Sequence, residues 1–189
     1  MRKIFASLFF AFSVAISFAQ RKLERSDHLT FKGVPIYGTL NQFISAMNKS
    51  GFTLMGTENG ITMLKGDFAA YENCILRVEA LKQKDLVSKI TVVFPEQYTW
   101  SYLSLNYFSL KELLTIKYGE PSESVEEFQS ISQPRDDNDK MNEVKTDRCK
   151  YYTTHETDQG RIQLSIDHDG EINCFVRLSY FDKVNGAKK

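Results

Sequence analysis

The sequence lacks the short motifs that mark several common enzyme classes. It has no glycine-rich phosphate loop, no H-E-x-x-H helix of zinc peptidases, no G-x-S-x-G turn of serine hydrolases and no C-x-x-C pair. These absences argue against common hydrolases and nucleotide enzymes. Proline is also scarce, and all four prolines fall at expected element boundaries or in a loop. We therefore predict no cofactor, no catalytic residue and no metal site, and we favour a protein that is not an enzyme.

The N-terminal segment has the pattern of a secretory signal peptide. Arg2 and Lys3 precede about fifteen mostly apolar residues, and Ser17 and Ala19 stand at positions −3 and −1 of a cleavage site before Gln20. The apolar run is shorter than the roughly 20 residues that a membrane span needs. We expect residues 1–19 to be removed and the protein to be periplasmic or secreted, without stable membrane insertion. An uncleaved anchor is the alternative.

An excess of charge of either sign is also missing. The chain has 24 basic and 24 acidic residues, and removal of Arg2 and Lys3 leaves 24 − 2 = 22 basic residues and a net charge of −2. A balance of this kind gives no electrostatic signature of nucleic-acid binding or of an anionic membrane surface. No nucleic acid is therefore expected among the partners.

Acidic residues concentrate in one segment. Between Gly119 and Asp147, nine carboxylates face three cations, and the segment contains QPRDDNDKMNE. This composition predicts a solvated loop within the domain. The run DDND at 136–139 is similar to part of a calcium loop, but it lacks the glycine and the distal glutamate of the EF-hand spacing. Solvation is the favoured interpretation, although a bound cation stays open.

Three cysteines remain in a chain expected in an oxidising compartment. Cys74, Cys149 and Cys174 each sit in an alternating strand pattern, where cysteine behaves as a small buried hydrophobe. If Cys149 and Cys174 lie on strands that flank a third strand, they are roughly 10 Å apart and cannot form a disulfide. We predict three reduced, largely buried thiols. Thiol catalysis with His155 is excluded, because six residues of one strand separate it from Cys149 by roughly 20 Å.

Two segments have the apolar spacing of helices. In the first, Leu40, Phe43, Ile44 and Met47 recur at i, i+3, i+4 and i+7. Thr39 with Gln42 forms a capping-box pattern there, and Gly51 is placed to end the helix. In the second, the apolar rhythm continues without a slip through Trp100, Leu103, Tyr107, Leu110 and Leu114. We predict one long helix over 100–118, which leaves Ser109 in its interior, with Gly119 beyond its end.

Each helix is followed by four segments rich in β-branched or apolar residues. The first set is FTLMGT, ITMLKGDFA, NCILRVEAL and VSKITVVF, and the second is ESVEEFQ, RCKYYTTHE, RIQLSID and INCFVRLSYF. The predicted fold is α+β, with two tandem helix-plus-four-strand units that form an antiparallel sheet of about eight strands with two helices on one face. The first unit covers residues 20–96 and the second residues 97–189, within one compact domain.

The last two strands allow a prediction of register. The apolar sets Ile162, Leu164, Ile166 and Ile172, Cys174, Val176, Leu178 both have even numbers, so opposite residues must sum to an even number. A three-residue loop of His168, Asp169 and Gly170, with Gly170 at positive φ, places Ile166 opposite Ile172. We predict this loop.

Several segments resemble a family of uncharacterised secreted proteins of gut Bacteroidetes. They are HLTFKGVPIYGTL, LKQKDLVSKITVVFP, LKELLTIKYGEPSE, DRCKYYTTHET and IQLSIDHDG, and the resemblance covers essentially the whole chain after residue 19. It implies secretion and brings no activity. Separately, two repeats of a helix plus four strands resemble the architecture of the β-lactamase inhibitor protein, which binds enzymes with the exposed face of its sheet. This second resemblance is one of architecture alone.

The candidate binding surface lies on the final strand. Phe175, Arg177 and Phe181 share the side opposite to Cys174 and Val176, and aromatic residues and arginine are enriched at interface hot spots. A loop or the N-terminal segment covering the two phenylalanines is the alternative. We predict a non-enzymatic binding module that contacts an unknown protein through this sheet face or through the acidic loop. The alternative function is an enzyme or small-ligand-binding protein with a pocket between helices and sheet.

A cluster at the same hairpin offers metal-ligand chemistry. Asp167, His168, Asp169 and Glu171 bring carboxylates and one imidazole to its tip. A polar turn is the favoured interpretation of this cluster.

Overall fold

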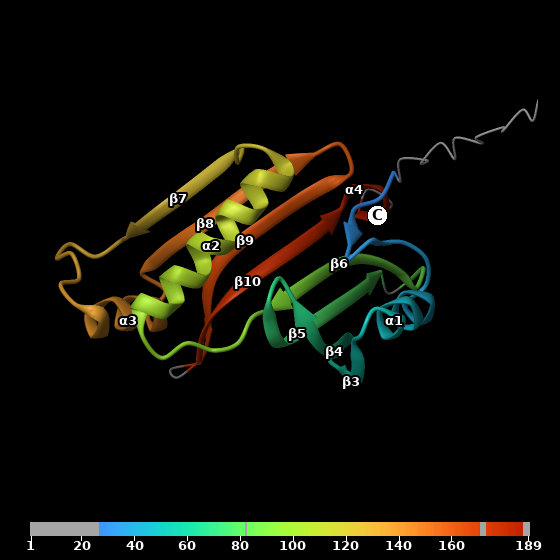
Figure 1. Ribbon diagram of the computed structural model, residues 1–189, viewed down its shortest axis with the longest axis horizontal. Coiled ribbons are helices and arrows are strands. Elements are labelled where there is room, and N and C mark those ends of the chain that lie inside the picture. The colour runs from blue at the N-terminus through green and yellow to red at the C-terminus, as the bar shows by residue number, and fades with distance from the viewer. Residues whose placement is uncertain (1–26, 82, 171–172, 187–189) are drawn as a thin grey trace, which may run out of the picture.

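The computed structural model describes residues 27–81, 83–170 and 173–186 (Figure 1). The chain has an α+β fold, with one antiparallel sheet of eight strands and one of two strands. The small sheet pairs β1 (Thr30–Phe31) with β2 (Val34–Pro35). The large sheet contains β3 (Thr53–Glu58), β4 (Ile61–Phe68), β5 (Tyr71–Leu81), β6 (Leu86–Val93), β7 (Glu123–Phe128), β8 (Cys149–Thr157), β9 (Gly160–Asp169) and β10 (Asn173–Asp182). The helices are α1 (Leu40–Lys49), α2 (Trp100–Tyr118), α3 (Asp137–Lys145) and α4 (Lys183–Gly186).

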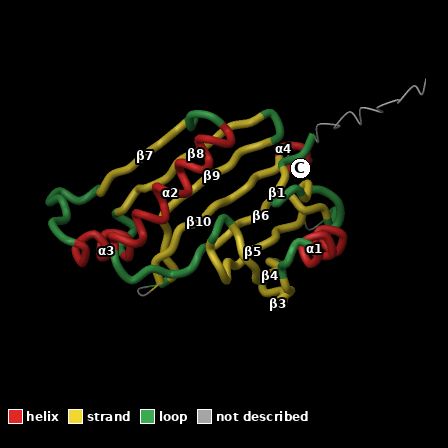
Figure 2. Tube along the Cα trace, viewed as in Figure 1, coloured by secondary structure: helices red, strands yellow, loops and turns green. Residues whose placement is uncertain are grey.

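The large sheet has the order β3-β4-β5-β6-β10-β9-β8-β7. Strands β3 to β6 follow one another along the chain, and β7 to β10 return toward them from the far edge, as the trace in Figure 2 shows. The two halves meet where β10 pairs with β6, with Leu178 opposite Val92. The last long strand of the chain therefore lies at the centre of the sheet, and the predicted α+β class and antiparallel sheet of eight strands are confirmed.

Helix α1 begins with the predicted capping box. The side chain of Thr39 accepts a hydrogen bond from the amide of Gln42 at 3.3 Å, and the Gln42 side chain accepts one from the amide of Thr39 at 3.0 Å. Gly51 follows the helix at φ +92°, a conformation that glycine adopts without steric penalty. Both sequence signals for the ends of this helix are confirmed.

Replacement of Thr39 with alanine should reduce the free energy of unfolding by about 1 kcal/mol, because it removes one of the two bonds of the capping box. Ser109→Ala is the matched control. Ser109 is exposed in the interior of α2 and caps no helix end, so its replacement should have little effect. Urea unfolding of both variants measures the difference, and equal losses would show that the cap contributes nothing specific.

Helix α2 is the single long helix that the apolar rhythm predicts. The hydroxyl of Thr99 accepts a hydrogen bond from the amide of Tyr102 at its start, and Gly119 ends it at φ +85°. All five predicted core residues, Trp100, Leu103, Tyr107, Leu110 and Leu114, are buried. In Figure 1 the helix crosses in front of β8 and β9. Its inner face thus supplies a row of large side chains to the core.

The core contains side chains from α1 and α2 and side chains from alternate positions of the central strands. It includes Phe43, Met47, Leu103, Tyr107, Leu110, Leu64, Leu76, Val78, Ile90, Val92, Ile162, Leu164, Cys174, Val176 and Leu178. Along β10 the even-numbered residues enter this core, as the sequence pattern predicted. Neighbouring odd-numbered residues therefore lie on the sheet face opposite to α2.

The acidic segment is not entirely a loop, which corrects the sequence prediction. Residues 137–145 form α3, capped by Asp136, whose side chain accepts a hydrogen bond from the amide of Asp139 at 2.9 Å. Met141 and Val144, three positions apart, are buried. Carboxylates in the first turn of a helix stabilise it through the helix dipole. The acidic run that resembled a solvated or calcium-binding loop is therefore a helix N-terminus.

The register of the last hairpin also differs from the prediction. Ile166 pairs with Val176, and Cys174 pairs with His168; the predicted partner Ile172 lies outside the described residues. The sum of paired numbers is even, as the alternation requires, but His168 and Asp169 belong to β9 and not to a loop. This register pairs all ten residues of β9 with β10, whereas the predicted one leaves the end of β10 without a partner on β9. The alternation of apolar residues determines only that the numbers of paired residues sum to an even number. Which even sum is adopted follows from the number of residue pairs, and the observed register forms more pairs than the predicted one.

The three cysteines are free, as predicted. Cys74 and Cys174 are buried and Cys149 is partly buried. Strand β9 lies between β8 and β10, so the strand order separates Cys149 from Cys174 in the way the sequence argument assumed. Among the described residues, no helix combines the length and the apolar character needed to cross a bilayer.

Candidate functional site

The three predicted surface residues share one side of β10 but differ in accessibility. Arg177 and Phe181 are partly exposed, whereas Phe175 is only 6% exposed. Phe175 lines a hollow of about 400 Å³ together with Ile75, Val93 and the loop residue Tyr98. The neighbouring strands and the loop after β6 therefore cover most of its ring. Of the three predicted residues, Arg177 and Phe181 are therefore the ones accessible to a partner on this face.

Phe181 lies between two cations. The ammonium of Lys89 on β6 is 5.5 Å from the ring centroid, and the guanidinium of Arg161 on β9 is 4.7 Å from it. Both residues are the direct cross-strand neighbours of Phe181. Lys89 also forms an ion pair with Glu79 at 2.6 Å. The strand register brings these three side chains together, because Lys89 and Arg161 lie on the strands on either side of Phe181 and on the same face of the sheet.

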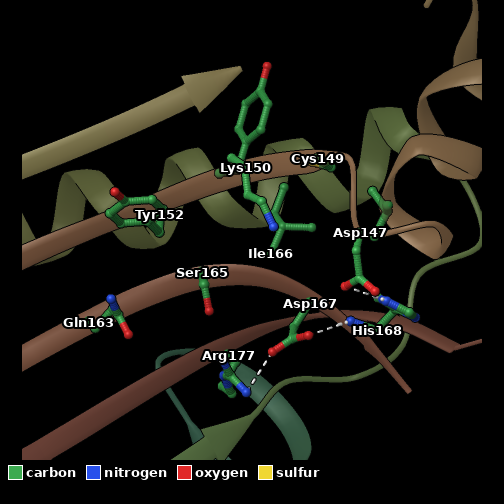
Figure 3. A pocket seen from close by; sticks show the side chains of 12 residues that line it. Asp147, Cys149, Lys150, Tyr152, Gln163, Ser165, Ile166, Asp167, His168 and Arg177 are labelled. Atoms are coloured by element: carbon green, nitrogen blue, oxygen red, sulfur yellow. Dashed lines mark hydrogen bonds and ion pairs between the residues drawn. The ribbon is translucent and has the colours of Figure 1, made fainter. Parts of the chain in front are cut away.

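A cleft opens beside Arg177 where two strands separate. The ladder between β8 and β9 ends at the pair Tyr152 and Ser165, although β8 starts at Cys149 and β9 continues to Asp169. Beyond this pair β8 remains paired with β7, and β9 remains paired with β10. The opening, shown in Figure 3, has a volume of about 220 Å³. We call it the β8–β9 cleft; its lining includes Lys150, Gln163, Asp167, His168 and Arg177.

Four ionisable side chains of the β8–β9 cleft form two pairs. Arg177 forms an ion pair with Asp167 at 2.6 Å, and Nε2 of His168 lies 3.1 Å from the carboxylate of Asp147 (Figure 3). The other ring nitrogen, Nδ1, is 2.7 Å from the carbonyl oxygen of Gly170. These contacts, the Gly170 carbonyl first, raise the pKa of His168. These two pairs, with Lys150 beside them, make the cleft suited to the recognition of a polar group.

The three described members of the candidate metal cluster at this hairpin, Asp167, His168 and Asp169, are not arranged around a common point. Asp167 faces Arg177, and His168 contacts Asp147. Glu171, the fourth member of the cluster, lies outside the described residues. Within the described part of the chain, no three His, Cys, Asp or Glu side chains are placed to hold a metal ion. Two carboxylates of the acidic segment are likewise engaged: Asp137 accepts a hydrogen bond from Ser101 at 2.9 Å, and Glu143 pairs with Arg148 at 3.0 Å.

Sequence reasoning missed one juxtaposition in this region. It compared Cys149 only with His155, yet His168, on the neighbouring strand, lines the same cleft as Cys149. The strand order assumed in the sequence argument would have indicated this, because it places Cys149 on β8 nearly opposite His168 on the neighbouring strand β9. Burial raises the pKa of the Cys149 thiol to about 12, so it stays protonated at neutral pH and is a poor nucleophile. The arrangement does not provide an activated thiol.

His155 and His168 should shift stability with pH in opposite directions. Burial lowers the pKa of His155, which lies against Tyr118 with Glu120 and Lys111 nearby. Its neutral form is favoured in the fold, so stability is present above its ordinary pKa of 6.5 and is lost as the pH falls below it. His168 has a raised pKa, so its contribution is present below 6.5 and is lost as the pH rises through the folded value.

Unfolding by urea at several pH values between about 7.5 and about 5.5 tests this pair. His155→Gln should reduce the loss of stability on acidification, and His168→Gln should increase it. Because the measured quantity is the slope with pH, a constant packing loss in either variant does not affect the comparison. Identical slopes in both variants and the unmodified protein would contradict the assignment.

The geometry of this region therefore combines an exposed aromatic and cationic group on β10 with a small polar cleft next to it. Neither feature contains a recognisable catalytic arrangement among the described residues. Comparison with protein-family models, with curated proteins and with solved structures finds no match for this chain.

Proposed function

We propose that this protein is a periplasmic or secreted binding module, without catalytic activity, that contacts a protein through the sheet face opposite to α2. The observation that carries the proposal is the arrangement around Phe181, whose partly exposed ring lies between Lys89 and Arg161. Arg177 lies on the same side of the same strand. Aromatic residues and arginine that are already ordered lose little conformational entropy on binding, which is why such residues dominate interface energies.

The acidic segment is a weaker candidate for the contact surface. Asp136, Asp137 and Glu143 all make hydrogen bonds or ion pairs within the chain. A partner that used these carboxylates would have to compete with existing interactions. In the group around Phe181, Lys89 is paired with Glu79, but the ring of Phe181 and the guanidinium of Arg161 are accessible without such an exchange.

The architecture supports the same proposal. We infer that the chain consists of two tandem units, each a helix followed by four strands, with α1 and α2 on one face of the common sheet. The order β3-β4-β5-β6-β10-β9-β8-β7 is what two such units produce when they join at their last strands. In this arrangement α1 and α2 leave the opposite face of the sheet uncovered, as in the β-lactamase inhibitor protein, and among the described residues Lys183 and Gly186 of α4 border Phe181 there. Secretion rests on the N-terminal pattern and on the resemblance to secreted Bacteroidetes proteins.

A capture experiment with matched variants tests the proposal. The protein is used as bait in an extract of the native cell envelope, captured proteins are identified by mass spectrometry, and affinity is then measured with the purified partner. Phe181→Ala should weaken binding about 30-fold, as expected for loss of about 2 kcal/mol at a hot spot. Tyr37→Ala, at another exposed aromatic residue, should bind like the unmodified protein. Equal affinity of all three proteins would refute the sheet face as the binding surface.

The β8–β9 cleft favours a second candidate function, the binding of a small polar ligand. The separated strands and the convergence of Lys150 and Arg177 provide donors in a volume of about 220 Å³. A cavity of this size suits only a small ligand. A screen of small carboxylates and amines by thermal denaturation tests it: a ligand that stabilises the unmodified protein but not Lys150→Ala would support the cleft. A screen without any such ligand would argue against it.

A further inference from the structure

The sheet face opposite to α2 has an apolar patch at one end of its central strands. Ile75 on β5, Val93 on β6 and Phe175 on β10 form it. Ile75 is the direct cross-strand partner of Val93, and Val93 is the partner of Arg177, two residues from Phe175 along β10. The other outward positions of these strands are mostly polar or charged. The strand register therefore gathers three apolar side chains on a face that is otherwise largely polar.

This patch lines the hollow of about 400 Å³ described above, which we call the Phe175 hollow. The loop after β6 lines it as well, and the amide of Gln97 donates a hydrogen bond to the carbonyl oxygen of Cys174 at 2.8 Å, which fixes this loop against β10. Tyr98 of the same loop lines the hollow, although 75% of its surface is exposed. Small-molecule sites have volumes of about 300 to 1,000 Å³. The hollow can therefore accommodate a ring between an apolar floor and an aromatic side chain.

A cation without a partner lines the same hollow. Arg77 on β5 is partly exposed, and among the described residues nothing forms an ion pair or a hydrogen bond with its guanidinium. Two neighbouring cations of this face differ, because Lys89 is paired with Glu79 and Arg177 with Asp167, each at 2.6 Å. A free guanidinium binds a carboxylate through two parallel hydrogen bonds. Arg77 therefore gives the hollow a preference for a carboxylate.

Two acidic residues limit the charge that the hollow accepts. Glu96 and Asp169 line it, and both are exposed to solvent. Solvent screens their effect on a ligand charge that is in direct contact with Arg77. A second negative charge would have no cation to pair with and would meet only their repulsion. The lining therefore favours a monocarboxylate over a phosphate or a dicarboxylate.

We propose that the Phe175 hollow binds a small monocarboxylate that contains an aromatic ring. The carboxylate pairs with Arg77, and the ring packs on the patch of Ile75, Val93 and Phe175 with Tyr98 beside it. Aromatic pairs contribute binding energy beyond the area that they bury, so the two aromatic side chains of the lining favour a ring over an alkyl chain.

The proposed site is separate from the two surfaces discussed above. Phe175 and Phe181 are six residues apart on β10, roughly 20 Å at 3.3 Å per residue. The β8–β9 cleft and the Phe175 hollow have no lining residue in common. The inference therefore does not depend on the proposed function.

The combination of an apolar patch with one free cation distinguishes this ligand from other classes. A neutral apolar compound would remove water from Arg77 without supplying a hydrogen-bond acceptor, which is costly. An amine would be repelled by the guanidinium. A small acid without a ring would leave the patch uncovered. An aromatic monocarboxylate satisfies both parts of the lining.

Titration of the ¹⁵N-labelled protein with 3-phenylpropionate, followed by NMR, is the first test. We expect saturable shifts at the amides of Ile75, Val93 and Phe175, with a dissociation constant in the millimolar range that is ordinary for a ligand of about eleven heavy atoms. Three matched probes at the same pH separate the contributions. Relative to the first compound, 3-phenylpropylamine reverses the charge, propionate lacks the ring and benzylmalonate has a second carboxylate. Each should bind at least about 10-fold more weakly.

Substitutions locate the bound carboxylate. Arg77→Gln should weaken binding of 3-phenylpropionate at least about 10-fold, because it removes a charge-assisted pair of hydrogen bonds, and Tyr98→Ala should weaken it several-fold. Lys65→Gln is the matched control: it removes the same charge from β4, directly opposite Ile75, at a residue outside the lining. Lys150→Ala, in the β8–β9 cleft, is the second control. Both controls should bind like the unmodified protein.

Each outcome supports or overturns the proposal. Saturable binding that requires the ring, the single carboxylate and Arg77, and that is unaffected by Lys65→Gln and Lys150→Ala, supports it. Absence of saturable shifts at the three amides would overturn it, and so would equal binding of the amine. Loss of binding in Lys150→Ala in place of Arg77→Gln would assign the ligand to the β8–β9 cleft and would also overturn it. The four probes are compared on the unmodified protein, so the test holds even if a variant folds poorly, and none of the readouts involves capture of a protein partner.

Discussion

Replacement of Gly160 with alanine is expected to reduce the free energy of unfolding by about 3 kcal/mol or more, which combines backbone strain with overpacking. Gly160 begins β9 at φ +153°, a conformation that other residues rarely adopt. A Cβ atom here would lie far inside van der Waals contact with the carbonyl oxygen of Phe181 on β10. It would also press on the side chain of Leu29. Because the obstacle is mainly backbone at the paired ends of β9 and β10, it cannot move aside cheaply.

Urea unfolding with Gly60→Ala as the matched control isolates the steric part. Gly60 also has positive φ, at +80°, but no atom lies within 4 Å of the position of its Cβ. Gly60→Ala should therefore lose only about 1 kcal/mol from backbone strain. Similar losses for the two variants would mean that the backbone around Phe181 relaxes easily, and the close approach of β9 and β10 would then have little energetic consequence.

Replacement of Asp182 with alanine is expected to be nearly as damaging, by about 3 to 5 kcal/mol for loss of a buried, hydrogen-bonded carboxylate. The Asp182 side chain is fully buried. Its oxygens accept hydrogen bonds from the amides of Leu29 and Asn185, each at 3.0 Å, and contact Nδ1 of His28 at 3.0 Å. One carboxylate therefore attaches the start of the described chain to its last strand and to α4.

Two measurements separate this attachment from a general loss of stability. Hydrogen exchange should accelerate most at the amide of Leu29, because Asp182→Ala removes its acceptor. Asp182→Asn keeps one acceptor oxygen and should lose less stability than the alanine variant. Asp169→Ala, at an exposed strand end, should change stability by no more than about 0.5 kcal/mol. Unchanged exchange at Leu29 would show that the N-terminal segment is held by other contacts.

The helices and strands could be predicted because their signals are local. The capping box at Thr39 and the unbroken spacing from Trp100 to Leu114 each depend on residues within one or two turns. The α3 helix was predictable in principle from Asp136 as a cap and from the spacing of Met141 and Val144. It was missed because an acidic, proline-containing segment has the composition of a loop, and composition received more weight than spacing.

The candidate site was only partly predictable. Alternation correctly placed Phe175, Arg177 and Phe181 on one side of β10, but it could not show that neighbouring strands and a loop cover Phe175. The two cations next to Phe181, Lys89 and Arg161, lie on β6 and β9. Strand β6 is separated from β10 by most of the second half of the chain. Such neighbours follow from strand order, which no local pattern contains.

The amino-acid sequence by itself determined the α+β class, the long helix, the alternation of the strands and the parity of the last hairpin, because each follows from short-range spacing and side-chain size. The tertiary structure alone decided which strands meet at β6 and β10, where β8 and β9 separate, and that Asp182 binds a segment more than 150 residues away. Each of these features depends on contacts between residues that are far apart in the sequence. The energy gained from such contacts must exceed the entropy lost when the intervening chain is closed into a loop.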